Sequence, residues 1–451
     1  MNIKTETICA IATGNGIGAI AIVRVSGPDS KKICSRCFSK GLSGIESHTL
    51  HFGTITAADG VQVDEVLMSY FAEGRSFTGE ESIEISCHGS PYVQQQILAV
   101  LQHHGCRMAK PGEFTQRAFI NGKLDLSQAE AVADLIAAQS KKAHQIALSQ
   151  LKGNLSSDLK VLREELIAFA SLIELELDFS EEDVEFADRT QLKALVGKVL
   201  NTVGDLAASF ALGNALKNGV PVAIVGAPNT GKSTLLNQFL GEDRAIVSDE
   251  AGTTRDVIEE TLNIEGILFR LIDTAGIRET TQHIESMGIE RSQQKIKEAS
   301  IVLCLSDATD KQNGAETEVW SHQLNKKFPD KKILFIANKS DLSKVIMKGA
   351  IPISAKEGIG MDVLHSEMVE AVVGTLDLEN DTIIANARHH EALIKTSDAL
   401  EKAAKGLEDG TTGDFIAMDI RQAMFYLGSI TGDISTDDLL GSIFSKFCIG
   451  K

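Results

Sequence analysis

The stretch Val220-Pro-Val-Ala-Ile-Val-Gly226, followed by Ala-Pro-Asn-Thr-Gly231-Lys232-Ser233, is the strongest indication of the fold of the central part of the chain. Its first part is a short apolar run typical of a buried strand. Residues 226–233 match the spacing G-x-x-x-x-G-K-[S/T], and a helical pattern begins at Ser233. Glycines let backbone N–H groups surround phosphates, and the helix N-terminus adds positive charge. The stretch therefore predicts a phosphate-binding loop in which Lys232 reaches phosphate oxygens and Ser233 ligates Mg²⁺.

Three further motifs follow this loop in the order expected of a guanine-nucleotide site. Asp273-Thr-Ala-Gly276 and Asn338-Lys-Ser-Asp341 each end a buried strand, and Ser354-Ala-Lys356 follows a short third one. The carboxylate of Asp341 can accept hydrogen bonds from guanine N1–H and its amino group, whereas adenine presents an acceptor at that ring position. We therefore predict GTP as the nucleotide, contacted by Asn229, Thr230, Gly231, Lys232, Ser233, Thr234, Ser248, Thr253, Thr254, Asp273, Thr274, Ala275, Gly276, Asn338, Lys339, Asp341, Ser354, Ala355 and Lys356.

The segment between the first two motifs suggests how GTP is hydrolysed. Thr254 is predicted to close over Mg²⁺ together with Ser233, as in other GTPase switch loops. Ile277 stands where Ras-like enzymes carry a glutamine that orients the attacking water, so another group must do this. The combination resembles the potassium-activated, dimerising GTPases. That resemblance implies K⁺ bound by Asn229, Ser248, Glu250 and Thr253, and a catalytic, water-orienting role for Glu285. From the residues alone, Glu285 is more simply explained as a solvated acid at a helix start.

The pattern on either side of this domain changes twice. Residues 1–119 contain alternating or continuous apolar runs at 21–27, 63–71 and 81–89, typical of strands, and a helix is expected at 91–104, begun by Pro91. Apolar residues then recur at helical spacing up to about Leu216 and again after residue 385. We predict a multidomain α/β protein with a β-rich α+β N-terminal domain (1–119), a discontinuous helical domain (120–215 and 377–451) and an inserted, Ras-like, doubly wound G domain (216–376).

Composition limits the class of protein. The chain has 451 residues, a formal net charge of −18 and seven scattered cysteines. The net charge does not favour nucleic-acid binding through bulk electrostatics. The cysteine pattern suggests a reducing compartment, and we see neither a signal-peptide pattern at the start nor an apolar run of about 18 residues. We expect a cytoplasmic protein without a membrane partner.

The outer parts of the chain resemble one family closely. They carry TICAIATGNGIGAIAIVRVSG, SFTGEESIEISCHGSP, KPGEFTQRAFINGKLDLSQAEAVADLI and a terminal FSKFCIGK around the inserted G domain. In these features the whole chain is similar to the MnmE (TrmE) family of tRNA uridine-modification GTPases. The resemblance implies an N-terminal domain that binds 5,10-methylene- or 5-formyl-tetrahydrofolate and forms a homodimer. It also implies a flavin (FAD)-dependent partner in a heterotetramer, and addition of an aminomethyl or carboxymethylaminomethyl group to C5 of the wobble uridine of certain tRNAs.

The same resemblance assigns residues outside the G domain. It implies folate contacts by Arg24, Glu84, Lys123 and Lys451, and a catalytic role for Cys448. From the residues alone, Arg24 and Glu84 also fit ordinary charges on a strand face, and Cys448 fits an idle terminal thiol. Cys34-Ser-Arg-Cys37 has too few ligands for a zinc site.

Two rival functions stay open at this point. A K⁺-dependent GTPase of ribosome assembly would share the G-domain motifs but usually carries a basic RNA-binding appendage. A membrane-remodelling GTPase would need a lipid-binding surface, and no basic amphipathic helix is evident.

Overall fold

The computed structural model describes residues 6–14, 16–178, 189–242, 260–272, 294–343, 348–373 and 382–450. The chain divides into two compact units. The first consists of Met1–Ala133, Gln150–Ala187 and Thr412–Lys451, and the second of Asp134–Ser149 and Asp188–Thr411. The predicted multidomain α/β class is confirmed, whereas the boundaries of the four predicted segments stay a prediction.

A six-stranded sheet forms the β-rich part of the first unit. Its order is β3-β4-β5-β2-β1-β6, antiparallel except for the β1–β6 pair. Three of the strands, β2, β4 and β5, are those predicted from the alternating runs. The strands are β1 (Ile8–Ile11), β2 (Ile20–Ser26), β3 (Thr49–Thr56), β4 (Gln62–Phe71), β5 (Ser82–His88) and β6 (Arg107–Met108).

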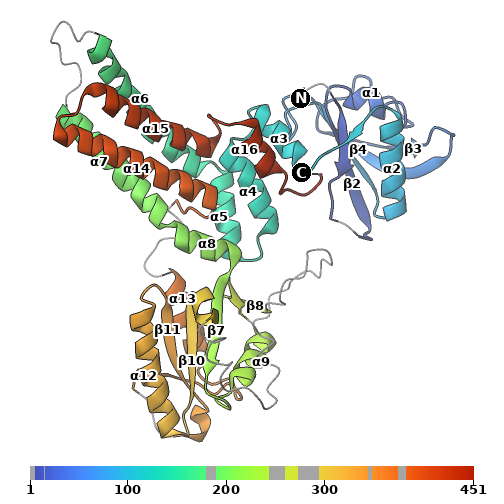
Figure 1. Ribbon diagram of the computed structural model, residues 1–451. Helices are drawn as coiled ribbons and strands as arrows, with labels where there is room; N and C mark the ends of the chain where they lie inside the picture. The colour runs from blue at the N-terminus through green and yellow to red at the C-terminus, as the bar shows by residue number, and fades with distance from the viewer. Residues whose placement is uncertain are drawn as a thin grey trace. The chain divides into compact units, whose positions relative to one another are not determined.

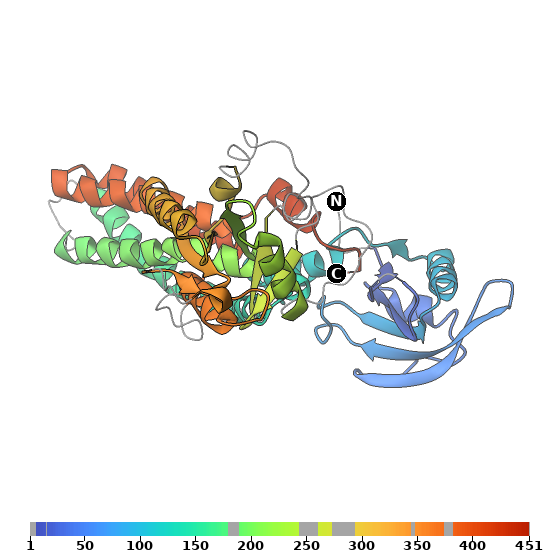
Figure 2. The same cartoon turned by 90° about the horizontal axis from the view of Figure 1, so that it is seen from below.

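Helices cover one face of this sheet and extend the unit. Helix α2 (Pro91–His103) begins at the predicted proline and packs against four strands (Figures 1 and 2). Helix α15 packs along α6, and its buried residues Ile416, Ile420, Ala423 and Leu427 recur at helical spacing. The remaining helices with most or all of their length in this unit are α1 (Ser30–Cys34), α3 (Glu113–Ile120), α4 (Leu126–Ala137), α6 (Asn154–Asp178), α15 (Gly413–Thr431) and α16 (Asp437–Phe444).

The second unit contains the doubly wound domain. Its sheet has the order β12-β11-β10-β7-β9-β8, and every pair is parallel except β8–β9. Alternate strand residues form two cores, one shared with α9 and α13 and the other with α12, so helices cover both faces (Figure 1). The elements are β7 (Val220–Gly226), α9 (Lys232–Glu242), β8 (Glu260–Ile264), β9 (Ile267–Leu271), β10 (Ile301–Asp307), α12 (Lys311–Lys327), β11 (Lys332–Asn338), η3 (Ser340–Leu342), β12 (Ile351–Pro352) and α13 (Met361–Val373).

Four helices complete the second unit: α5 (Lys141–Leu151), which ends just beyond it, α7 (Arg189–Ala208), α8 (Phe210–Asn218) and α14 (Ala387–Asp409). By length and hydropathy alone, Thr190–Asn218 could cross a membrane, a test that core helices of globular proteins also pass. In the structure α7 packs along α14, and Leu192, Val196, Val199 and Val203 are buried at helical spacing. Packing against α14 therefore accounts for these four apolar residues. The lack of a membrane partner stays a prediction.

Candidate nucleotide site

The phosphate loop joins β7 to α9 at the edge of the sheet where the parallel strands end. Gly226 and Gly231 have φ angles of 155° and 96°, in the range that favours glycine. A Cβ on Gly226 would lie 2.4 Å from the Leu305 carbonyl oxygen, and one on Gly231 would lie 2.2 Å from Nδ2 of Asn338. Gly226 is therefore required by the close approach of β10 and Gly231 by the side chain of Asn338 on β11, and the loop has the shape that the motif predicts.

Lys232 lies at the start of α9 with its ammonium group folded into the loop. Its Nζ donates hydrogen bonds to the carbonyl oxygens of Gly226 (2.9 Å) and Ala227 (2.8 Å). Burial of the ammonium group, with a smaller contribution from Lys295, lowers the pKa of Lys232. Ser233 is exposed in the first turn of the same helix. A partly desolvated cation and an exposed hydroxyl beside a helix N-terminus suit a Mg²⁺-bound polyphosphate.

Asn338 joins the phosphate loop to the base-recognition loops. It ends β11 and is buried. Its Nδ2 donates to the Thr230 carbonyl oxygen (2.8 Å), and its Oδ1 accepts from the Ala355 N–H (3.0 Å). One amide side chain thus ties three predicted site segments together, although they lie far apart in sequence.

The residues that follow Asn338 reach the surface. Asp341 is exposed in η3, and Lys356 is exposed after the buried pair Ser354 and Ala355. Ser340 N–H donates to the Ile353 carbonyl oxygen (3.0 Å), which holds the two loops side by side. The predicted guanine-selecting carboxylate of Asp341 is therefore accessible to solvent, and the residues that hold its loop, Asn338, Ser354 and Ala355, are buried.

Several predicted residues lie outside the residues that the structure describes, and their roles stay predictions. They belong to the switch segments, to the motif after β9 and to the chain end: Ser248, Glu250, Thr253, Thr254, Asp273, Thr274, Ala275, Gly276, Ile277, Glu285 and Lys451.

The structure brings together the predicted folate residues that it describes. Arg24 on β2 and Glu84 on β5 are register partners, and Arg24 Nη2 lies 2.9 Å from Glu84 Oε1. The guanidinium also lies over the rings of Phe77 and Phe114. Lys123 Nζ donates to the Gly74 carbonyl oxygen (3.0 Å), so the loop that carries Phe77 contacts both predicted cations. The ion pair is partly exposed beside an aromatic ring, an arrangement that suits a flat polar ligand.

Cys448 is exposed, whereas the other six cysteines are buried. Its carbonyl oxygen accepts a hydrogen bond from Gly112 N–H (3.3 Å), and a Cβ on Gly450 would lie 2.1 Å from the Ile11 carbonyl oxygen. The terminal segment thus packs against the first unit's own β1 and the start of α3. The thiol is accessible to a substrate, and its chemical role stays a prediction.

Sequence reasoning missed one polar side chain at the nucleotide site. Asp307 ends β10, the strand between β7 and β11, and pairs with Lys339 of the base-recognition motif. Its place as the last residue of a buried parallel strand is the signal that could have revealed it, because such residues gather at one sheet edge.

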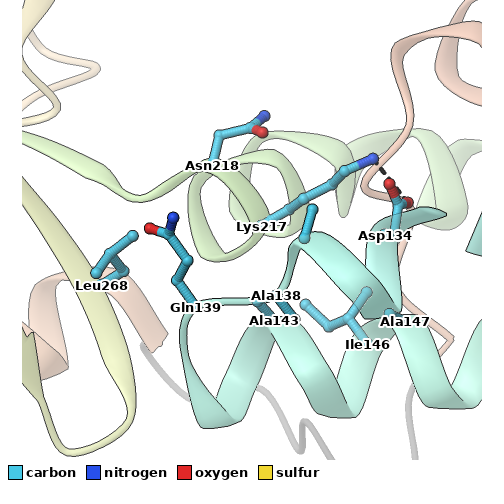
Figure 3. A pocket seen from close by; sticks show the side chains of 10 residues that line it. Asp134, Ala138, Gln139, Ala143, Ile146, Ala147, Lys217, Asn218 and Leu268 are labelled. Atoms are coloured by element: carbon cyan, nitrogen blue, oxygen red, sulfur yellow. Dashed lines mark hydrogen bonds and ion pairs between the residues drawn. The ribbon is translucent and has the colours of Figure 1, made fainter. Parts of the chain in front are cut away.

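A cavity of about 220 Å³ lies elsewhere in the second unit. Alanines of α4 and α5, the end of α8 and Leu268 of β9 line it, and Lys217 forms an ion pair of 2.7 Å with Asp134 at its wall (Figure 3). None of the predicted site residues lines this cavity, so it is separate from the nucleotide site.

Comparison with known proteins identifies the family. Residues 126–448 match the family model of the MnmE helical domain, and residues 7–123 match that of the GTP-binding protein TrmE N-terminus. The chain is 51% identical over 460 residues to the tRNA modification GTPase MnmE of Flavobacterium psychrophilum, covering 99% of both chains. It is 49% identical over 455 residues to that of Cytophaga hutchinsonii, covering 99% of this chain and 98% of the relative.

Among solved structures, the FeoB G-domain of Methanococcus jannaschii matches 34% of this chain and 97% of its own, with 20% identity and a TM-score of 0.26. On the strength of the two family models and the full-length relatives, this chain belongs to the family of the tRNA modification GTPase MnmE.

Proposed function

We propose that this GTP hydrolase, which acts in tRNA modification, forms the aminomethyl or carboxymethylaminomethyl group at C5 of wobble uridines in the cytoplasm. The observation that carries the GTPase part is the buried Asn338, which connects the phosphate loop to the loops of Asp341 and Ala355. A guanine-nucleotide site needs these segments at fixed positions, because its affinity depends on preorganised contacts to both phosphates and base.

The residues present divide the work at this site. Lys232 would hold phosphate oxygens and Ser233 would hold Mg²⁺. The ammonium group and the metal ion would together neutralise the charge that develops on the γ phosphate. Asp341 would select guanine. We propose that K⁺ lies beside Asn229, where it supplies the positive charge that other GTPases take from an arginine. Asn229 is exposed in the loop, and its φ of 63° places its backbone in the left-handed region, which is uncommon for a non-glycine residue.

The first unit would carry the modification chemistry. We propose that a one-carbon tetrahydrofolate binds beside Arg24, Glu84 and Lys123, and that the chain acts as a homodimer with a flavin-dependent partner. The partly exposed Arg24–Glu84 pair next to Phe77 supports the folate proposal. The accessible Cys448 supports participation of the terminal segment. GTP turnover would then drive the G domains together and apart.

The decisive experiment uses Asp341→Asn in a reconstituted reaction with tRNA, the flavin-dependent partner and the folate. Exchange of the carboxylate for an amide should transfer specificity from guanine to xanthine nucleotides, because xanthine offers an acceptor where guanine has its amino group. We expect wobble-uridine modification by this variant with XTP and not with GTP, measured by mass spectrometry of digested tRNA. Modification that is independent of any nucleotide would overturn the proposal. A strain lacking the chain that keeps its wobble modification but accumulates ribosome precursors would favour the ribosome-assembly alternative.

A further inference from the structure

Asp307 is a partly buried carboxylate whose two oxygens have separate partners. Oδ1 accepts hydrogen bonds from the Thr309 N–H (2.9 Å) and hydroxyl (2.6 Å). Oδ2 accepts from Nζ of Lys339 (2.5 Å). In the β10–β11 register Asp307 lies opposite Asn338, the residue that precedes Lys339. The carboxylate is therefore fixed on one side by its own turn and directed on the other at the base-recognition motif.

Lys339 in turn contacts the phosphate loop. Its Nζ also donates to the carbonyl oxygen of Asn229 (2.9 Å). Both Lys339 and Asn229 occupy the left-handed region, with φ angles of 64° and 63°, which costs a non-glycine residue free energy. The chain Asp307–Lys339–Asn229 thus links two strained loop residues that belong to different parts of the nucleotide site.

Electrostatics keep this link charged. Burial raises the pKa of Asp307, but hydrogen bonds from Lys339 and Thr309 outweigh it, and the net pKa is lowered. The side chains of Asp307 and Lys339 are 18% and 34% exposed, so solvent screens their attraction less than that of a surface pair. A lysine side chain has many rotamers, and a fixed carboxylate partner restricts them before a ligand arrives.

We propose that Asp307 is a positioning residue for the guanine nucleotide and its monovalent cation: it holds the Lys339 ammonium against the Asn229 carbonyl and so fixes the distance between the base loop and the phosphate loop. This inference rests on the proposed function, because Asn229 is the proposed K⁺ ligand. It assigns Asp307 no contact with the nucleotide itself. Loss of the carboxylate should loosen both loops together.

The test compares Asp307→Asn with Asp310→Asn in the full-length protein. Asp310 loses the same charge three residues away, but it caps α12 through Gln312 N–H and Asn313 N–H, and asparagine caps helices about as well. We expect Asp307→Asn to raise the Kd for GDP and GTP about tenfold, mainly through faster dissociation, and to raise several-fold the K⁺ concentration for half-maximal GTPase activity. Asp310→Asn should change neither. Unchanged Kd and K⁺ response in Asp307→Asn would overturn the proposal.

A double-mutant cycle separates positioning from general stability. In a Lys339→Ala background, Asp307→Asn should have no further effect on the nucleotide Kd, since the proposed link to the phosphate loop through Lys339 is gone. Additive losses of affinity would overturn the proposal. So would a loss of affinity across the variants that simply follows the loss of thermal stability of the nucleotide-free protein. If the protein of natural sequence binds GTP and the Asp307→Asn variant binds it equally well, this inference alone fails. If the unmodified protein binds no GTP, the proposed function fails instead.

Discussion

Each unit contains a buried polar network built from motif residues. The network of the first unit stays inside its domain, whereas that of the second unit leads to an exposed residue. In the first unit, Arg117 is 1% exposed, and its Nη1 and Nη2 lie 3.0 Å from Glu80 and Glu113 respectively. Arg107 and the Lys110 N–H complete the bonds to Glu113. In the second unit, the network of Asn338 leads outward to Asp341 at the surface.

A supporting motif and a binding motif differ in where their charged and polar groups end up. Glu113 and Arg117 belong to the KPGEFTQRAF block that marks the family, yet their charges neutralise one another inside the domain. A charge that is already satisfied and shielded has little left to offer a ligand. Asn338 is satisfied as well, but the exposed Asp341 follows three residues later, where hydrogen-bonding capacity can be used by a base.

The largest effect should come from Arg117→Met. It leaves the buried carboxylate of Glu113 and the half-buried carboxylate of Glu80 without their shared cation, and breaking a buried pair typically costs about 3–5 kcal/mol. Hydrogen exchange of the full-length protein should show strongly reduced protection in β2 and β5, while β10, β11 and the GTP Kd stay unchanged.

The matched control is Arg107→Met, because Arg107 pairs with the same Glu113 but is 34% exposed. We expect a loss of about 1 kcal/mol or less. An Arg117→Met protein that is as stable as this control, or that loses GTP affinity, would contradict the division between the two networks.

Asn338→Ala should give the next largest effect, confined to the other unit. The Thr230 carbonyl and the Ala355 N–H would lose their partner in a buried position, at about 1–3 kcal/mol each. We expect GTP and GDP binding to weaken on the order of 100-fold by calorimetry, with unchanged exchange protection in β2 and β5. Asn263→Ala, on the exposed side of β8, should leave the Kd unaltered. Tight nucleotide binding by Asn338→Ala would show that the loops hold their positions without this link.

Much of this architecture could be predicted because its signals are local. The run at 220–226 and the helix starting at Pro91 each follow from composition and spacing over a few residues. Asn338 could be predicted as a site residue because its motif ends a buried strand. Its hydrogen bonds to Thr230 and Ala355 could not, since they depend on how the loops after three different strands approach each other.

The networks themselves were beyond sequence reasoning for the same reason. Arg117 donates hydrogen bonds to the carbonyl oxygen of Glu6 and to the carboxylate of Glu80, which lie far away along the chain. Asp307, at the end of β10, pairs with Lys339, which follows the adjacent strand β11. No periodicity encodes such pairs, because tertiary packing selects them among many possible ion pairs. The position of Cys448 beside Gly112 likewise depends on packing between the C-terminal segment and the start of α3.

The smallest effect concerns pH, because it depends on the titration of one carboxyl group in the first unit's network. Burial raises the pKa of Glu113, but hydrogen bonds from Arg107, the Lys110 N–H and Arg117 outweigh it and lower the pKa from 4.5 to about 2. A carboxyl whose pKa is lower in the folded state stabilises that state above the unfolded pKa, and this contribution is lost as the pH falls from about 4.5 towards 2. Between pH 7 and pH 4 the loss should be about 1 kcal/mol, detected as a lower urea midpoint for β2 and β5 by pulse-labelled hydrogen exchange. Glu113→Gln should be less stable at pH 7 and should lack this part of the pH dependence, because the amide does not titrate. If the difference between the two proteins stays constant from pH 7 to pH 3, the Glu113 carboxylate is not the charged centre of the network, and Arg117 must be held mainly by Glu80.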